Sequence, residues 1–171
     1  MKRVAIVSSA SSSGRTTLGT ELARRLDAPF HELDALHHGP NWTEATASAL
    51  RAKVEPIVAG DAWVVDGAYR AKLGDLVLRN ADLVVWLDLP ARVWLPRLIR
   101  RTVRRMIRRE ELWNGNRETV RNVVFSRDSL LWYSLRNYPR RRRLYPTELA
   151  PYEVVRLRTP KEVAQWLARF G

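Results

Sequence analysis

The stretch from Val4 to Thr17 constrains the fold of this chain more than any other. It begins with the apolar, mostly β-branched run Val4-Ala5-Ile6-Val7, which is typical of a buried strand. Small residues follow as far as Gly14, and an amphipathic helical pattern then begins. The apolar face of that pattern consists of Leu18, Leu22 and Leu26. A strand, a small-residue loop and a helix in this order predict a loop whose free backbone N–H groups cluster at the helix N-terminus.

The loop approximates the phosphate-binding pattern GxxxxGK followed by Ser or Thr. Ser9 stands at the first glycine, Gly14 matches the second, and Thr16 matches the hydroxyl. Arg15 stands where the pattern has lysine. Small side chains let phosphate groups approach the N–H groups, and the helix dipole adds partial positive charge there. The predicted nucleotide-binding residues of the loop are Ala10, Ser11, Ser12, Ser13, Gly14, Arg15, Thr16 and Thr17.

The alternative for this loop is a capping turn, Ser11-Ser12-Ser13, in front of an amphipathic helix. Under the phosphate-binding interpretation, the hydroxyl of Thr16 is a ligand for Mg²⁺, and Arg15 supplies a fixed positive charge.

Composition restricts the class of protein and its partners. The formal net charge is +12, and the only lysines are Lys2, Lys53, Lys72 and Lys161. An arginine excess of this size predicts an anionic partner such as a nucleotide, a nucleic acid or a membrane surface. The chain has no cysteine, which excludes disulfides and thiolate chemistry. No signal peptide and no uninterrupted apolar run of about 18 residues is visible, so we expect a cytoplasmic protein without a membrane partner.

Strand and helix patterns alternate along the chain. Strands are predicted at 3–8, 30–34, 62–67, 83–88 and 154–157. Helices are predicted at 18–26, 44–58, 73–79, 93–109, 128–137 and from Thr159-Pro160 onward. Asn41 or Thr43 is the expected cap of the second helix, and Pro139 is expected to end the fifth. The alternation predicts the α/β class, with a parallel five-stranded sheet, helices on both faces and a single domain over residues 1–171.

Acidic residues follow three of the predicted strands. They are Asp34, Asp66 with the adjacent Gly67, and Asp88. Ligands in parallel sheets bind beyond the carboxyl ends of the strands, so we expect these acids around the phosphate loop. Asp34 is the candidate base or orienting group for an acceptor hydroxyl, the alternative being a cap. Asp88 is a candidate for ordering Mg²⁺, the alternative being a buried acid in a turn.

The predicted helix at 93–109 is rich in arginine. Its expected apolar stripe is Leu95, Ile99, Thr102 and Met106, and its expected arginine face is Arg97, Arg101, Arg104 and Arg108. The face has three interpretations: a lid that neutralises charge in phosphoryl transfer, a nucleic-acid-binding face, or a solvated surface. The lid interpretation makes residues 93–127 a helical insertion.

Several segments together resemble the P-loop kinase superfamily, specifically adenylate-kinase-like small kinases and the bacterial topology modulation protein group. They are Ser9–Thr17, Leu33-Asp34-Ala35-Leu36, Val65-Asp66-Gly67-Ala68-Tyr69, Trp86-Leu87-Asp88-Leu89-Pro90, the arginine-rich helix and Asn137-Tyr138-Pro139-Arg140-Arg141. The resemblance implies a nucleoside-monophosphate-kinase-like fold with an arginine-rich lid. It also implies that Arg97 lies against the adenine and that Arg101 touches the transferred phosphate. Phosphate-binding roles for Arg127 and Arg136, and an adenine-holding role for Arg158-Thr159-Pro160, are implied in the same way.

Two residues depart from the family pattern. Ser12 stands where the family usually has glycine, and a Cβ strains the backbone turn that glycine supports. Arg15 stands where the family has the lysine that follows the migrating phosphoryl group. Both replacements are expected to affect the catalytic rate more than nucleotide binding.

The sequence thus predicts a phosphotransferase that uses ATP and Mg²⁺ and transfers the γ-phosphoryl group to a small acceptor. The predicted catalytic residues are Arg15, Asp34, Arg97, Arg101 and Arg104. The predicted acceptor-binding residues are Asp34, His37, Asp66, Gly67, Tyr69, Arg127 and Arg136. Thr16 and Asp88 are the predicted metal ligands, and Arg97, Arg158 and Pro160 complete the nucleotide site. The alternatives are a catalytically weak nucleotide-binding sensor or interaction module, and a nucleic-acid-binding protein on a kinase-like fold.

Overall fold

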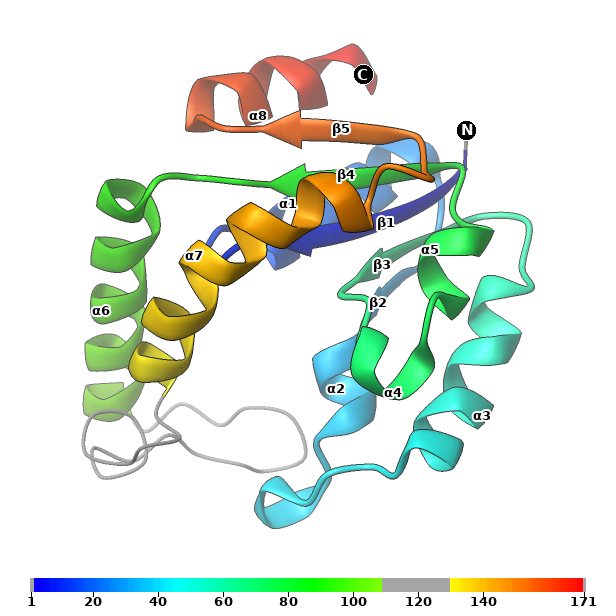
Figure 1. Cartoon of the computed structure of the whole chain (residues 1–171), viewed down its shortest axis with the longest axis horizontal. Helices are drawn as coiled ribbons and strands as arrows, with labels where there is room; N and C mark the ends of the chain where they lie inside the picture. The colour runs from blue at the N-terminus through cyan, green and yellow to red at the C-terminus, as the bar shows by residue number, and fades with distance from the viewer. Residues whose placement is uncertain (1, 109–129, 171) are drawn as a thin grey trace.

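The computed structural model describes residues 2–108 and 130–170 and contains a five-stranded parallel sheet (Figure 1). The strand order is β2-β3-β1-β4-β5. The strands are β1 (Arg3–Ser8), β2 (Phe30–Glu32), β3 (Trp63–Asp66), β4 (Leu83–Leu87) and β5 (Val154–Leu157). The predicted α/β class and the five-stranded parallel sheet are therefore confirmed.

Helices cover both faces of the sheet, as alternate residues of β1 show. Ala5 and Val7 point to one face, where they pack in a core with α3 (Ala47–Val58), α4 (Arg70–Leu73) and α5 (Leu76–Asn80). Val4 and Ile6 point to the opposite face, beneath α1 (Arg15–Leu26) and α8 (Pro160–Leu167). Because both faces are buried, the strands are continuous apolar runs rather than alternating ones.

Two long helices form a third, smaller core beyond the carboxyl end of β4. They are α6 (Ala91–Arg108) and α7 (Leu130–Glu148), which lie side by side in Figure 1. Trp94 and Leu98 of α6 are buried with Ala10 of the loop after β1, and Tyr138 of α7 packs against this cluster. The pair of helices is thus attached directly to the phosphate loop. Of the predicted insertion 93–127, residues 109–127 lie outside the described part of the chain, so the insertion stays a prediction.

Several predicted boundaries were wrong. The strand β2 ends at Glu32, and Asp34 lies in the first turn of the short helix α2 (Leu33–His37). Thr46, rather than Asn41 or Thr43, caps α3, and its hydroxyl accepts a hydrogen bond from the Ala49 backbone N–H. A 3-10 turn, η1 (Pro40–Trp42), occupies the chain before it, and another, η4 (Ala168–Phe170), follows α8.

The helix α7 passes through Pro139 and Pro146 instead of ending at the first proline. Tertiary contacts offset the backbone hydrogen bonds that the prolines remove. The Tyr138 ring lies 5.3 Å from Trp94, and the Tyr145 ring lies 5.5 Å from Trp86, measured between ring centroids. Aromatic packing on both sides of Pro139 therefore holds the helix together.

The apolar stripe of α6 also differs from the prediction. Trp94, Leu98 and Thr102 are buried, whereas Ile99 is 51% exposed. The buried face is rotated from the predicted stripe because Trp94, which the prediction left out, fills the core under the phosphate loop.

Candidate active site

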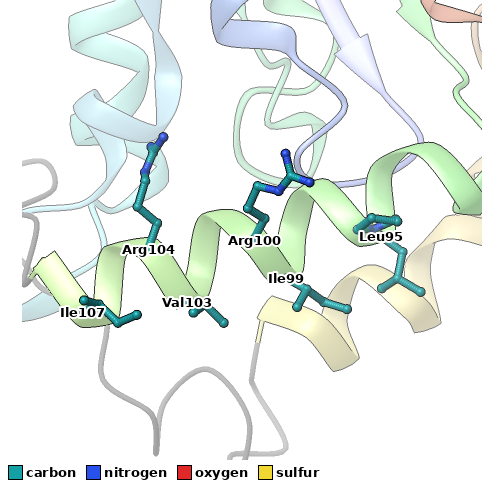
Figure 2. A pocket seen from close by; sticks show the side chains of 7 residues that line it. Leu95, Ile99, Arg100, Val103, Arg104 and Ile107 are labelled. Carbon is teal, nitrogen blue, oxygen red and sulfur yellow. The ribbon is translucent and has the colours of Figure 1, made fainter.

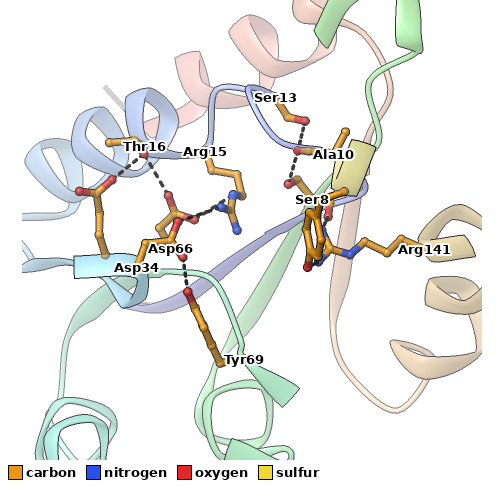
Figure 3. Close-up of polar contacts among 11 residues, drawn as sticks. Ser8, Ala10, Ser13, Arg15, Thr16, Asp34, Asp66, Tyr69 and Arg141 are labelled. Carbon is orange, nitrogen blue, oxygen red and sulfur yellow. Dashed lines mark hydrogen bonds and ion pairs between the residues drawn. The ribbon is translucent and has the colours of Figure 1, made fainter. Parts of the chain in front are cut away.

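The loop after β1, which is the predicted phosphate loop, turns through two residues with positive φ before α1 begins. Gly14 is the N-cap of α1 with φ 89°, and Ser12 has φ 57°, so both lie in the left-handed region. The hydroxyls of Ser8 and Ser13 both donate to the carbonyl oxygen of Ala10, at 2.8 and 2.7 Å, which fixes the loop from both ends (Figure 3). Within the described residues, the buried Oγ of Ser12 has no hydrogen-bond partner. A loop with an unsatisfied hydroxyl and free amides at a helix N-terminus suits an anionic ligand.

The first residue of the loop belongs to a buried polar network. The Oγ of Ser9 accepts a hydrogen bond from Nε1 of Trp86 at 2.9 Å and donates one to Oδ1 of Asp88 at 2.8 Å. The Asp88 side chain is fully buried, and Arg156 and Arg142 bind it at 2.6 and 3.0 Å. The guanidinium of Arg156 also stacks over Trp86, 4.0 Å from the ring centroid. The carboxylate of Asp88, a predicted metal ligand, is therefore occupied by a hydroxyl and two arginines.

The hydroxyl of Thr16, the other predicted metal ligand, is surrounded by different acids. It lies 2.6 Å from Oε1 of Glu32 and 3.1 Å from Oδ2 of Asp66. These residues come from the start of α1, the end of β2 and the end of β3. The structure thus places Thr16 with Asp66 and Glu32, and Glu32 is a site residue that the sequence analysis missed.

Arg15 bridges the loop and two of the predicted acids (Figure 3). Its Nε lies 3.0 Å from Oδ1 of Asp66, as an ion pair that lacks hydrogen-bond alignment, and its Nη2 lies 3.7 Å from Oδ2 of Asp34. The hydroxyl of Tyr69 donates to the other oxygen of Asp34, Oδ1, at 2.6 Å. The structure therefore brings four predicted site residues into one cluster at the carboxyl ends of β1 and β3.

Burial is the main influence on the pKa values of the side chains in this cluster. It raises the pKa of Asp66 to about 6, although Arg15 opposes the shift. Burial and the neighbouring Asp34 raise the pKa of Tyr69, so its hydroxyl remains a donor. Burial disfavours the charge of Arg15, but Asp66 and Asp34 more than offset this and raise its pKa. The cluster holds a permanent cation next to a carboxyl group whose pKa is raised to about 6.

Two further predicted acceptor residues, His37 and Gly67, lie next to this cluster. The ring of His37 is buried 4.7 Å from the Tyr69 ring, and its Nε2 lies 3.4 Å from Glu44. Burial, together with the charge of Lys72, lowers the pKa of His37. Gly67 has φ 107°, and its N–H donates to the carbonyl oxygen of Ile6, so this glycine turns the chain where β3 ends.

The arginines of α6 differ in their surroundings. A Cβ added at Gly14 would lie 3.9 Å from Nη1 of Arg97, so the Arg97 guanidinium stands beside the N-terminus of α1. Figure 2 shows Arg100 and Arg104 extending from one side of α6, and Ile99 and Val103 from another. An open, mainly apolar groove of about 660 Å³ is lined by these four residues together with Leu95, Pro96 and Ile107. Arg104 of the prediction is thus on the same side as Arg100, and Arg101 is half-buried.

The other predicted arginines lie on α7, after β5 or outside the described residues. Arg136 is exposed on α7, and Arg127 lies outside the described residues. Arg158 and Pro160 follow β5, where the backbone N–H of Arg158 donates to Glu162 at 2.8 Å. Arg141 was not among the predicted site residues, yet its Nη1 reaches the carbonyl oxygen of Ser8 at 3.5 Å. The run Arg140–Arg143 gave no spacing signal that separates Arg141 and Arg142, which contact Ser8 and Asp88, from Arg140 and Arg143.

The described residues bear on metal and membrane binding in two ways. They contain no group of three or more His, Cys, Asp or Glu side chains placed to hold a metal ion. Mg²⁺ commonly takes only one or two protein ligands and completes its shell with phosphates and water. Thr16 and its neighbouring carboxylates fit that mode. Within residues 2–108 and 130–170, no helix has the length and apolar content needed to cross a bilayer.

The five-stranded parallel sheet with helices on both faces has a P-loop kinase fold. Solved kinases with this fold align over almost the whole chain. A shikimate kinase from Acinetobacter baumannii, in complex with shikimate, aligns with a TM-score of 0.61 and 15% identity, over 99% of this chain and 90% of that one. A gluconokinase from Sinorhizobium meliloti 1021 aligns with a TM-score of 0.53 and 20% identity, over 98% of this chain and 92% of its own.

A deoxyadenosine kinase from M. mycoides with bound dCTP gives a TM-score of 0.53 and 11% identity, over 97% of both chains. These similarities confirm the predicted P-loop kinase fold. No protein-family model matches the chain, and neither does any curated protein sequence.

Proposed function

We propose that this protein is a small phosphotransferase that binds ATP with Mg²⁺ and transfers the γ-phosphoryl group to a hydroxyl or phosphate of a small acceptor. The observation that carries the proposal is the cluster at the N-terminus of α1. There, a left-handed Gly14 opens the helix, and the next residue, Arg15, contacts Asp66 and Asp34. A phosphate loop directly beside carboxylates brings a nucleotide and an acceptor hydroxyl together, which is most of what phosphoryl transfer requires.

Each residue of the cluster has a role in this proposal. The amides of residues 10–17 and the Arg15 guanidinium hold the phosphates. Thr16, with Asp66 or Glu32 beside it, would hold Mg²⁺, which neutralises phosphate charge when bound. Asp34 orients the acceptor hydroxyl and accepts its proton, with Tyr69 fixing one of its oxygens.

The arginines of α6 complete the proposed site. Arg97 stands beside Gly14 and is positioned to stabilise the charge that develops on the phosphoryl group. Arg101 and Arg104 lie one and two turns further along the same helix, and the proposal assigns them to the same lid. His37 and Gly67 border the acceptor side, because they adjoin Tyr69 and the end of β3.

The loop also supports a second candidate, a nucleotide-binding sensor with weak catalysis. Ser12 adopts φ 57°, a conformation that costs a non-glycine residue roughly 1–2 kcal/mol. Arg15 is planar and bulkier than lysine, so it can bind phosphate in the ground state without following the moving phosphoryl group. Binding of this kind lowers the nucleotide dissociation constant without raising turnover.

Calorimetry with MgADP, followed by an ATP-consumption assay over a panel of small hydroxyl and phosphate acceptors, tests the proposal. We expect saturable nucleotide binding, and loss of about 1.5–3 kcal/mol of it in Arg15→Ala, which removes a charged hydrogen-bond donor. Arg15→Lys is the matched control and is expected to retain affinity. If Arg15→Ala binds MgADP as tightly as the wild type, the nucleotide does not lie in this loop and the proposal fails.

A further inference from the structure

We propose that Arg15 couples the two halves of the site, because the carboxylates on the acceptor side and the phosphates of the nucleotide compete for its single guanidinium. Without nucleotide, Arg15 is bound to Asp34 and Asp66. A bound nucleotide draws it to the phosphates and exposes Asp34 to the acceptor. The inference rests on the proposed function and adds an order to it: nucleotide first, acceptor second.

The two oxygens of Asp34 are engaged from opposite directions. Tyr69 donates to Oδ1 at 2.6 Å, and Nη2 of Arg15 lies 3.7 Å from Oδ2 (Figure 3). The Tyr69 contact is a short hydrogen bond, whereas the Arg15 contact is an ion pair longer than a hydrogen bond. Arg15 is therefore the partner that can leave. Its departure frees Oδ2 while Tyr69 continues to hold the carboxylate by Oδ1.

Arg15 is the cation that the phosphate loop itself contributes. It is the only basic residue between Val4 and Thr17 and the first residue of α1, where the free amides of the helix converge. Only 26% of its side chain is exposed, and Nε lies 3.0 Å from Asp66. A phosphate bound by the loop amides draws this cation from the carboxylates, because one guanidinium cannot give both its best contacts.

Asp66 can release Arg15 without losing all its partners. Its side chain is 5% exposed, and its Oδ2 still faces the hydroxyl of Thr16 at 3.1 Å. The contact of Arg15 with Oδ1 lacks hydrogen-bond alignment, so its loss breaks an ion pair and no directed bond. The site therefore has two states, with Arg15 on the carboxylates or on the phosphates, and a ligand that prefers one state shifts the population toward it.

Coupling of this kind is reciprocal, and the nucleotide side can be measured without knowing the acceptor. The competition predicts that removing the charge of Asp34 strengthens nucleotide binding. A residue that acts only on the acceptor would leave nucleotide binding unchanged. The decisive measurement is the dissociation constant of ADP for the wild type and Asp34→Asn, by calorimetry, in EDTA and again with Mg²⁺.

We expect Asp34→Asn to bind ADP three- to tenfold more tightly than the wild type in EDTA. The gain should disappear when Arg15→Ala is added to both proteins, because the competing cation is then absent. Asp61→Asn, at an exposed position after α3, removes the same charge away from the site and should leave the ADP affinity unchanged. If Asp34→Asn fails to fold, as judged by circular dichroism, Asp66→Asn in EDTA replaces it with the same expected direction.

An ADP affinity for Asp34→Asn equal to or weaker than that of the wild type overturns the coupling, as does a gain that survives in the Arg15→Ala background. A gain of the same size in Asp61→Asn overturns it too, because the effect is then general electrostatics. Wild-type protein that binds no ADP overturns the proposed function itself, so the two failures are distinguishable.

Discussion

The hydroxyl of Ser9 donates a 2.8 Å hydrogen bond to Oδ1 of Asp88, which ties the first residue of the phosphate loop to the end of β4. Trp86 donates to the same hydroxyl, and Arg156 binds the other oxygen of Asp88. A glycine at position 9 could make neither side-chain contact. The serine therefore gives the base of the loop a buried anchor in place of the conformational freedom that a glycine provides.

The first prediction is that Asp88→Asn destabilises the fold and leaves the metal dependence of nucleotide binding intact. An amide oxygen can still accept from Ser9, but Arg156 and Arg142 lose a fully buried charge partner. The free energy of unfolding should fall by about 3 kcal/mol. This value is at the lower end of the range for breaking a buried ion pair, because both arginines are partly exposed. Urea unfolding measures it.

The alternative role of Asp88, as a ligand of Mg²⁺, gives a different result. In that case, the ratio of the ADP dissociation constants with and without Mg²⁺ changes in Asp88→Asn. Asp82→Asn is a useful control, because it removes a carboxylate paired with Arg3 outside the site. A changed ratio in Asp88→Asn alone would restore Asp88 as a metal ligand.

The second prediction concerns the backbone of the loop. Ser12 has φ 57°, so Ser12→Gly should relieve local strain and raise the free energy of unfolding by about 0.5–1 kcal/mol, after the entropy cost of glycine is subtracted. Gly14→Ala should act in the opposite direction, because Gly14 has φ 89°. Its new Cβ would meet Arg97 only at an ordinary 3.9 Å, so backbone strain is the cause. Thermal unfolding of both variants tests this assignment. A Gly14→Ala variant that is as stable as the wild type, or more stable, would contradict it.

The local sequence was enough to predict those elements that a short stretch of residues defines by itself. The run Val4–Val7 and the run at 83–87 are strands because both faces of the sheet are buried. The last helix begins at Thr159-Pro160 as predicted, and Thr159 caps α8, with Glu162 N–H donating to its hydroxyl. The acids Asp34 and Asp66 come together because parallel strands end at one edge, and Arg15 lies between them.

Other features depended on contacts that a local pattern does not contain. The continuation of α7 through Pro139 is stabilised by rings on α6 and β4, which are far away in sequence. The contacts of Asp88 depend on Arg142 and Arg156, which lie 54 and 68 residues further along the chain. Spacing within the run Arg140–Arg143 could not identify which arginine faces inward, because the orientation is fixed by the tertiary packing of α7.

The third prediction is a pH dependence of stability that originates from Asp66. Its pKa is about 6 in the folded chain, against an ordinary value of 3.8, because the side chain is buried. The folded state thus binds this proton more tightly than the unfolded state does, and stability from this group falls as the pH rises from about 4 to 6. A shift of about two units corresponds to about 3 kcal/mol.

Asp66→Asn lacks this titration. Urea unfolding of both proteins at pH 4 and pH 7 should show that the wild type loses about 2–3 kcal/mol relative to Asp66→Asn over that interval. A difference between the two proteins that is the same at both values would mean that Asp66 titrates outside this window.

The fourth prediction separates a catalytic arginine from a nucleic-acid-binding face on α6. Arg97 stands beside Gly14 at the phosphate loop, whereas Arg143 is exposed on α7. If Arg97 stabilises the transferring phosphoryl group, Arg97→Ala should lower turnover by roughly 10²-fold or more, and Arg143→Ala should leave it unchanged. If the arginine-rich helices bind nucleic acid, each substitution should instead weaken DNA binding and reduce its salt slope by about one.

An ATP-consumption assay and a gel-shift titration over a range of salt concentrations measure the two effects on the same proteins. Equal losses of DNA affinity in both variants, with turnover unaffected by Arg97→Ala, would assign the helix to nucleic acid and remove Arg97 from the proposed transfer site.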